Sequence, residues 1–285
     1  MEMRRLKNYT LIFLLMCQCL CYAQFSPSPN ALDKPKQMDK SVIELQYSLK
    51  FKKSFKQQTY DVDDRIVQIG EHMVKDYSKI IFHYDSLNTI NDKKGLPSPI
   101  NPNTVFCYEL INDLDKAESF VKYRLALNGG TLCYTSKLPI LEWEQLPDST
   151  LNVLGYTCNL AQTHFAGRDY WVWYSIDVPL SYGPYKFYGL PGLVMKVEEK
   201  TGLYIWELVG MKNVSSPIMQ YTYEAEKKCT ELEAQKTITR MQKNPVRFLE
   251  QMGRRMFIVG PDGRSRPSTA YPEIPDEEYE PLEKY

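Results

Sequence analysis

The chain has 285 residues and a formal net charge of zero, because 35 basic residues balance 35 acidic ones. A near-neutral chain with no basic stripe lacks the electrostatic footprint of a nucleic-acid-binding protein. Hydrophobic residues make up 43% of the chain and aromatic residues 13%, enough for the core of one large domain or two small ones. The 21 tyrosines favour strands and interfaces over a helical bundle.

Residues 1–23 have the composition of a secretory signal peptide. A positively charged start that includes Arg4 precedes an apolar region, and Cys21 and Ala23 supply the small residues that signal peptidase needs at positions −3 and −1. We therefore predict cleavage before Gln24 and export to the periplasm or the extracellular space.

An outer-membrane lipoprotein is the alternative, because three cysteines stand near the end of this segment: Cys17, Cys19 and Cys21. None of them follows the small residue that lipid attachment requires. The segment is shorter than the roughly 20 apolar residues of a membrane span, and no second long apolar run follows. We expect no transmembrane segment in the mature chain, whose formal charge is −2 after the loss of three basic residues and one acidic residue.

Composition divides the rest of the chain into three parts. Residues 24–40, rich in Pro, Ser, Asn and Lys, predict a flexible leader. Residues 41–258 predict one β-rich domain that ends in a helix over about residues 222–253, interrupted by Pro245. Residues 259–285 hold five prolines and an acidic cluster, and predict a disordered tail.

Alternating hydrophobicity predicts strands along the domain. In residues 42–51, apolar side chains such as Leu45 and Tyr47 alternate with polar ones, which is typical of a half-buried strand. Residues 61–64 predict an acidic turn. Further strands are predicted at residues 65–70, 104–110, 120–127, 131–135, 151–161, 170–176, 193–198 and 203–211.

The clearest local signal is a hairpin. Leu193 and Met195 alternate with more polar residues, residues 199–202 supply the turn, and Gly202 can take the positive φ that such a turn needs. These features predict a mainly β fold with a C-terminal helix. A curved antiparallel sheet or half-barrel resembling lipoprotein-carrier folds is the first architecture, and a β-sandwich is the alternative.

The sequence contains no recognisable catalytic constellation. The three histidines, His72, His83 and His164, stand in no zinc-protease motif, and no nucleophile elbow, phosphate-binding loop or dinucleotide fingerprint occurs. We therefore expect no catalytic residue, no metal and no cofactor. Cys158 and His164 on one strand would lie about 20 Å apart, too far for a nucleophile and its base.

Two other groups of side chains could carry chemistry. Asp61, Asp63 and Asp64 lack the Gly and the distal Glu of a calcium loop, so we interpret them as a solvated turn. Four cysteines remain after cleavage, with no spacing of a zinc ribbon or a redox pair. Two disulfides in any of three pairings and buried free thiols both stay open for these residues: Cys107, Cys133, Cys158 and Cys229.

Large aromatic side chains concentrate in residues 170–188. Aromatic residues with polar tips are favoured at binding surfaces. The candidate binding residues are Trp171, Trp173, Tyr185 and Phe187. The alternative is a large β core with tyrosine hydroxyls at its rim.

Residues 182–193 read Tyr-Gly-Pro-Tyr-Lys-Phe-Tyr-Gly-Leu-Pro-Gly-Leu, and they resemble the signature of the GLPGLI family, with Val194 in place of the final Ile. Residues 154–158, 167–174 and 176–179 also resemble the family pattern. The resemblance implies a secreted protein of Bacteroidetes, often encoded near outer-membrane receptors, with no established activity. It assigns no catalytic residue.

Within this motif, Leu190-Pro191-Gly192-Leu193 has the form of a type II turn. Pro191 presets φ, Gly192 would supply the positive φ of the next position, and Gly189 lets another backbone approach. We interpret the motif as a structural corner that seeds the following hairpin, in preference to a binding loop.

Together, these observations predict an envelope protein that is not an enzyme and that binds a small hydrophobic ligand, a peptide or an outer-membrane partner such as a receptor. The alternative is a peptidase-like hydrolase whose site is assembled from residues distant in sequence. A pocket lined by Trp171, Trp173 and Tyr185 would favour binding. Convergence of a histidine with cysteine or carboxylates would favour hydrolysis.

The mature chain should begin at Gln24. Intact mass and N-terminal sequencing of the exported protein should show the loss of residues 1–23 and no added lipid. A diacylglyceryl group on Cys17, Cys19 or Cys21 would contradict this prediction and identify a lipoprotein.

Overall fold

The computed structural model describes residues 26–223, 225–260, 262–271 and 274–284, so the predicted signal peptide lies outside the described residues. The helices are α2 (Lys79–Lys93), α3 (Glu231–Lys243), α4 (Pro245–Gln251) and the 3₁₀ turn η1 (Ser268–Ala270). The strands are β1 (Asp33–Phe51), β2 (Asp61–Ile69), β3 (Met73–Ser78), β4 (Tyr108–Asp113), β5 (Glu118–Arg124), β6 (Thr131–Lys137), β7 (Glu144–Val153), β8 (Tyr156–Phe165), β9 (Arg168–Ser175), β10 (Leu193–Glu199), β11 (Tyr204–Thr222), β12 (Glu226–Lys228), β13 (Phe257–Val259) and β14 (Ser265–Pro267).

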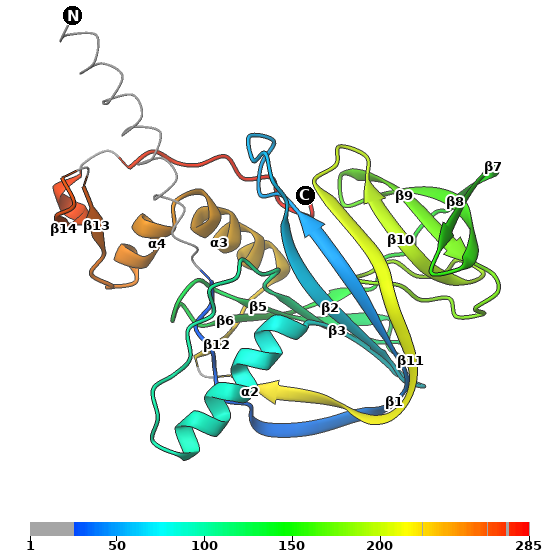
Figure 1. The fold of residues 1–285 in the computed structure, drawn as a ribbon, viewed down its shortest axis with the longest axis horizontal. Coiled ribbons are helices and arrows are strands. Elements are labelled where there is room, and N and C mark those ends of the chain that lie inside the picture. Colours follow the sequence, from blue (N-terminus) through cyan, green and yellow to red (C-terminus); the bar gives the residue numbers. More distant parts are fainter. Residues whose placement is uncertain (1–25, 224, 261, 272–273, 285) are drawn as a thin grey trace, which may run out of the picture.

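Twelve of these strands form one sheet, in the order β12-β6-β5-β4-β3-β2-β1-β11-β10-β9-β8-β7 (Figure 1). Strand β12 runs parallel to β6, and the other neighbours in this sheet are antiparallel. The edge strands β12 and β7 are not paired with each other, so the sheet is open and does not close into a barrel. The prediction of a mainly β fold with a curved antiparallel sheet and a C-terminal helix is confirmed.

The longest strand pair, β1 with β11, lies in the middle of the sheet. Its register runs from Asp33 opposite Thr222 to Phe51 opposite Tyr204, with four shifts along the way. Such irregularities bend strands and increase twist, and both strands curve strongly in Figure 1. The curved pair divides the sheet into two wings, β2–β6 with β12 on one side and β7–β10 on the other.

The alternation predicted for residues 42–51 is confirmed. Leu45, Tyr47 and Leu49 are fully buried, and they join Trp206 of β11 in one hydrophobic core. The Tyr47 hydroxyl donates to the Val194 carbonyl at 2.6 Å, which satisfies its only polar atom inside the core. The predicted hairpin of β10 and β11 also forms, with Gly202 in its turn at φ +79°.

Helices cover both faces of the β2–β6 wing. Arg124 of β5 forms a salt bridge at 2.8 Å with Asp85 of α2. The adjacent Tyr123 accepts a hydrogen bond from Gln242 of α3. Because successive side chains of a strand point to opposite faces, α2 and α3 lie on opposite sides of this wing.

The C-terminal helix is shorter than predicted. Thr222 is the last residue of β11, Glu226–Lys228 form β12, and α3 begins only at Glu231. Pro245 does interrupt the helical segment, because it occupies the first turn of α4 and Asn244 caps that helix by accepting from the Arg247 amide.

Two segments predicted to lack fixed structure take part in the fold. Residues 33–40 of the predicted leader lie in β1, where Lys36 pairs with Gln220 of β11. The predicted tail contains the last residue of β13 and all of β14 and η1, and its Leu282 is buried. Composition did not reveal this order because the partners of both segments lie far away in the sequence.

Two local predictions were wrong. The predicted acidic turn at residues 61–64 is the start of β2, where Asp63 is fully buried beside Arg65. Residues 151–161, predicted as one strand, contain the tight turn between β7 and β8. Leu154 and Gly155 make that turn with φ of 51° and 86°.

The roles predicted for two glycines of the GLPGL motif are exchanged in the structure. Gly189 has the positive φ, +93°, whereas Gly192 does not lie in that region. Gly192 is needed for close approach, because a Cβ there would lie 2.1 Å from the Ser175 carbonyl oxygen. Leu193 donates its amide to the Val178 carbonyl at 2.9 Å, so the motif is a corner against the preceding loop rather than a closed type II turn.

Gly192→Ala should destabilise the protein by roughly 1–3 kcal/mol, because the added methyl group overlaps the Ser175 backbone. Gly210→Ala is the matched control, since a Cβ at Gly210 of β11 meets no atom within 4 Å. The control should be neutral or slightly stabilising. Urea melts of the two variants should therefore differ in midpoint, and equal midpoints would contradict the close approach.

Candidate functional site

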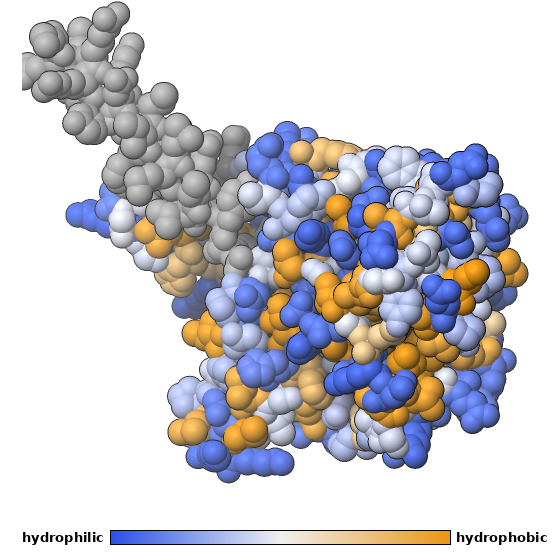
Figure 2. Space-filling view, turned by 45° about the vertical axis from the view of Figure 1, so that its right-hand side comes forward, coloured by the Kyte–Doolittle hydropathy of each residue, from blue (hydrophilic) through white to orange (hydrophobic). Residues whose placement is uncertain are grey.

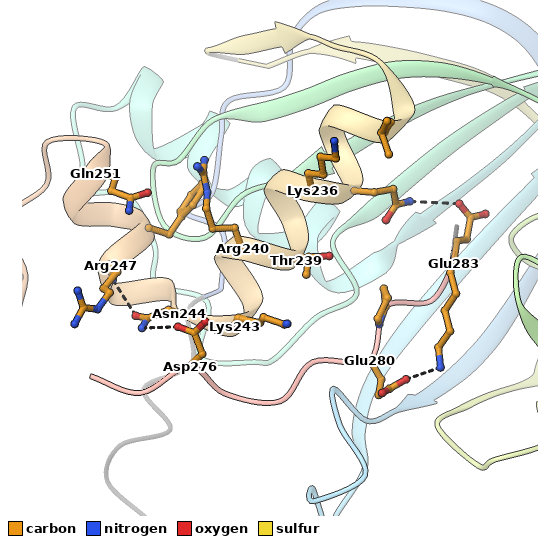
Figure 3. Close-up of a pocket in the computed structure, with 15 residues that line it drawn as sticks. Lys236, Thr239, Arg240, Lys243, Asn244, Arg247, Gln251, Asp276, Glu280 and Glu283 are labelled. Carbon is orange, nitrogen blue, oxygen red and sulfur yellow. Dashed lines mark hydrogen bonds and ion pairs between the residues drawn. The ribbon is translucent and has the colours of Figure 1, made fainter. Parts of the chain in front are cut away.

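A groove of about 830 Å³ lies between α3 and α4 on one side and residues 276–284 on the other (Figure 3). Its volume falls in the range of ligand sites, roughly 300–1,000 Å³. The groove is lined by side chains of both walls: Leu232, Gln235, Lys236, Thr239, Arg240, Lys243, Asn244, Arg247, Phe248, Gln251, Asp276, Glu280, Pro281, Glu283 and Lys284.

The helical wall begins with a capping box. The Thr230 hydroxyl accepts from the Glu233 amide, and the Glu233 carboxylate accepts from the Thr230 amide at 2.8 Å. Ala234, Ile238 and Met241 form the buried face of α3. The helix is therefore fixed at its start and along one side, which determines the direction in which its other side chains project.

Three basic residues lie on the exposed side of α3 that lines the groove. Lys236, Arg240 and Lys243 follow the i, i+4, i+7 spacing of one helix face, and all three are exposed. None of them forms a salt bridge with any residue that the structure describes. Arg240 lies over the Phe248 ring at 5.5 Å, which holds its guanidinium near the helix surface.

The opposite wall carries acidic residues that already have partners. Glu283 accepts from Lys186 at 2.8 Å, Glu280 pairs with Lys284 at 2.7 Å, and Asp276 accepts from the Asn244 side chain at 3.1 Å. The carboxylates of this wall are thus compensated while the cations of α3 are not. The groove consequently offers unpaired positive charge to a ligand.

The concave interior of the sheet offers no comparable space in the described part of the chain. Two further pockets have volumes of only about 40 and 10 Å³, room for a few waters and for one water at most. The loop before β10 fills the interior, with Tyr185 and Phe187 packed against Trp206 at ring distances of 6.4 and 5.9 Å. An apolar ligand would have to displace these side chains.

The structure separates the four candidate binding residues. Tyr185 and Phe187 are core residues, 3% and 1% exposed. Trp171, 41% exposed, and the half-buried Trp173 alternate in β9 with buried residues, so they project from the opposite face of that strand. No common pocket joins all four, and a binding role for the two tryptophans stays a prediction.

The surface in this part of the molecule is mixed in character. Figure 2 shows hydrophobic residues interspersed with hydrophilic ones over one face. Lys200 lies over the Trp171 ring at 5.4 Å, which covers part of the largest exposed aromatic side chain. Single exposed apolar residues are normal on protein surfaces and do not by themselves mark a site.

The histidines do not converge with cysteines or with one another. His72 pairs with Asp115 at 3.0 Å and His164 with Asp169 at 2.8 Å, both at the surface. His83 is exposed on α2, and its sequence neighbour Asp85 is engaged by Arg124. Among the described residues, no group of three or more His, Cys, Asp or Glu side chains could hold a metal ion.

The cysteines are poor candidates for a nucleophile. The four cysteines among the described residues are free thiols, and burial raises the pKa of each, to about 11 for Cys107 and about 12 for Cys133. The reactive thiolate is therefore scarce near neutral pH. Cys158 is buried on β8 while His164 is exposed on the same strand, so the pair does not form a catalytic unit.

Asp63 is the most perturbed carboxyl group near the core. Burial raises its pKa to about 6, although Arg65 opposes the shift. Arg65 pairs with Asp63 at 3.3 Å and with Asp76 at 2.7 Å, and Asp76 also accepts from the Tyr185 amide. This cluster anchors the inner loop through the Tyr185 amide, and we interpret it as structural.

A protein-family model described as "Protein of unknown function (Porph_ging)" matches residues 166–196, which include β9 and the loop that leads to β10. No curated protein matches the sequence. No helix in the described ranges is long and apolar enough to cross a membrane.

Two solved structures similar to the chain are those of PNGF-II in the P21 and C2 space groups. Their sequence identities are 17% and 16%, and their TM-scores are 0.44 and 0.46. Each match covers 71% of this chain and 34% of the other, so this chain spans about a third of the length of those proteins.

The separation of the aromatic residues can be tested by truncation. Phe187→Ala should destabilise the fold by about 3–5 kcal/mol, because it removes a ring packed against Tyr170 at 4.8 Å and against Trp206. Trp171→Ala should cost less than about 1 kcal/mol, since its side chain is largely at the surface. Comparable losses of stability in denaturant melts would mean that Trp171 also belongs to the core.

Proposed function

We propose that this chain is an exported, non-enzymatic binding protein of the cell envelope that holds an acidic, extended segment of a partner protein. The observation that carries the proposal is the row of Lys236, Arg240 and Lys243 along the groove, none of which forms a salt bridge with a described residue. A partner that supplied carboxylates would form charge-assisted hydrogen bonds with this row.

The spacing of the cations supports an extended peptide. Successive residues of a helix rise by about 1.5 Å, so Lys236 and Arg240 lie about 6 Å apart along the axis. An extended chain advances about 3.3 Å per residue, and alternate residues point to the same side. Carboxylates at every second position of an extended peptide would therefore match the cations of α3.

We prefer a peptide over a small hydrophobic ligand because side chains of the chain itself occupy the concave face of the sheet. The curved open sheet supports a likeness to lipoprotein-carrier folds, as part of this proposal. In such a carrier an apolar ligand would lie against the concave face, where this chain has Tyr185, Phe187 and Trp206 in mutual contact. The exposed groove beside α3 is the larger available site.

Export and family membership form the second half of the proposal. The composition of residues 1–23 supports secretion, and the match of residues 166–196 to a family of unknown function supports membership of the GLPGLI group, whose signature residues 182–193 resemble. An envelope protein of this kind would meet its partner outside the cytoplasm, with an outer-membrane receptor as one candidate.

A fluorescein-labelled peptide of alternating Glu and Ser should bind the mature protein, and the charge reversal Lys236→Glu/Arg240→Glu/Lys243→Glu should weaken the Kd at least about tenfold. Binding to the unchanged protein should also fall with added salt, because the groove is open to solvent. Fluorescence anisotropy measures both effects.

The matched control is Lys93→Glu/Lys94→Glu/Lys137→Glu, which changes the net charge by the same amount at exposed positions outside the groove. This control should leave the Kd nearly unchanged. Equal weakening by the two triple variants would show that the peptide responds only to overall charge. That result would contradict the proposal that the peptide binds in the groove.

A further inference from the structure

Residues 279–284 lie in a site that the rest of the chain builds, and they do so without forming a helix or a strand. The backbone of the segment is fixed near each end. The Glu280 amide donates to the Lys53 carbonyl at 2.7 Å, and the Lys284 amide donates to the Ala166 carbonyl at 2.8 Å. The segment is therefore held near both ends by backbone contacts, as a bound peptide would be, and it bends at Leu282 and Glu283.

Arg168 binds the carbonyl groups in the middle of the segment. Its guanidinium donates to the Pro281 carbonyl at 2.6 and 3.0 Å and to the Leu282 carbonyl at 3.1 Å. Arg168 is only 4% exposed, and Glu199 holds it from behind at 3.2 Å. A buried, preoriented arginine that donates to backbone carbonyls recognises the main chain of a peptide rather than a particular side chain.

Lys186 supplies the side-chain specificity. Its ammonium group donates to the Glu283 carboxylate at 2.8 Å, and both side chains are almost fully buried, at 2% and 0% exposure. Gln235 of α3 donates to the other oxygen of that carboxylate at 3.4 Å. Leu282, next to it, is 2% exposed and belongs to the hydrophobic core.

Glycine gives the segment room at its end. A Cβ at Gly167 would lie 2.8 Å from the Lys284 Cβ and 2.9 Å from the Lys284 carbonyl oxygen. Gly167 also has φ +72°, a conformation that glycine adopts at low cost. Gly167, Arg168 and Lys186 all fall within the family match at residues 166–196.

We propose that these residues form a binding site for peptides of the type Tyr-Glu-Pro-Leu-Glu. The chain fills the site with its own C-terminal segment, and a peptide from another molecule can occupy it in place of that segment. An empty site would leave Lys186 with only the longer contact to Glu231 at 3.6 Å and the Arg168 donors without carbonyls, and both losses are costly. Exchange of one bound peptide for another is therefore more favourable than an empty site. Arg168 and Lys186 do not line the acidic-peptide groove, although the segment that they bind forms one of its walls.

The test uses the full chain with a protease recognition sequence inserted after Tyr271. Cleavage leaves the C-terminal fragment attached only by its contacts. We expect the fragment to stay bound in size-exclusion chromatography, and to be replaced by a millimolar excess of a labelled synthetic peptide, Asp-Glu-Glu-Tyr-Glu-Pro-Leu-Glu-Lys, which copies residues 276–284. A scrambled peptide of the same composition should not replace it.

Specificity for the carboxylate is measured with a second peptide that carries Glu283→Gln. It should bind the cleaved chain at least about tenfold more weakly than the first peptide, since it removes the closer of the two carboxylates that pair with Lys186. In a chain with Lys186→Met this preference for Glu over Gln should disappear, and Trp171→Met serves as the control that retains it. A merely structural contact would lower stability without changing this preference.

Three results would overturn the proposal. The cleaved chain could lose its near-ultraviolet circular dichroism even with the peptide present, which would make the segment an inseparable part of the fold. The fragment could stay in place with the fold intact and not exchange. The scrambled and Glu283→Gln peptides could bind as well as the original, which would remove the specificity that Arg168 and Lys186 are inferred to provide.

Discussion

The pairing of β1 with β11 is the constraint on which the rest of the structure depends. Both strands have 19 residues, and they bring the start of the described chain against residues beyond position 200. The irregularities along their register let the pair bend. This bend gives the sheet two wings and a concave side, so the positions of every other strand and of the inner loop follow from it.

The concave side is filled from within the same chain. The loop before β10 contributes Tyr185 and Phe187, and the C-terminal segment adds Leu282. Gly192 allows the loop to enter at all, because only a residue without a Cβ can approach the Ser175 backbone so closely. Because these side chains occupy the concave side, a partner would bind at the periphery, where α3 and the C-terminal segment meet.

Buried ions decide which distant segments come together. Arg65 with Asp63 and Asp76, Arg168 with Glu199, and Lys186 with Glu283 are each almost fully removed from solvent. Such pairs add little net stability relative to apolar residues, but breaking one leaves an uncompensated charge inside the protein. They therefore select one arrangement of the inner loop and the C-terminal segment over others.

The sequence by itself determined the features whose cause is local. Alternation predicted the buried face of β1 and the hairpin at Gly202, and composition predicted a helix broken at Pro245, because these depend on neighbours within a few residues. The spacing of Lys236, Arg240 and Lys243 on one helix face is also visible in the sequence, but it does not by itself predict a binding site. Only the tertiary structure set the C-terminal segment opposite α3, buried Asp63, separated Trp171 from Tyr185 and gave Gly192 its role, because each of these depends on contacts between residues far apart in the chain.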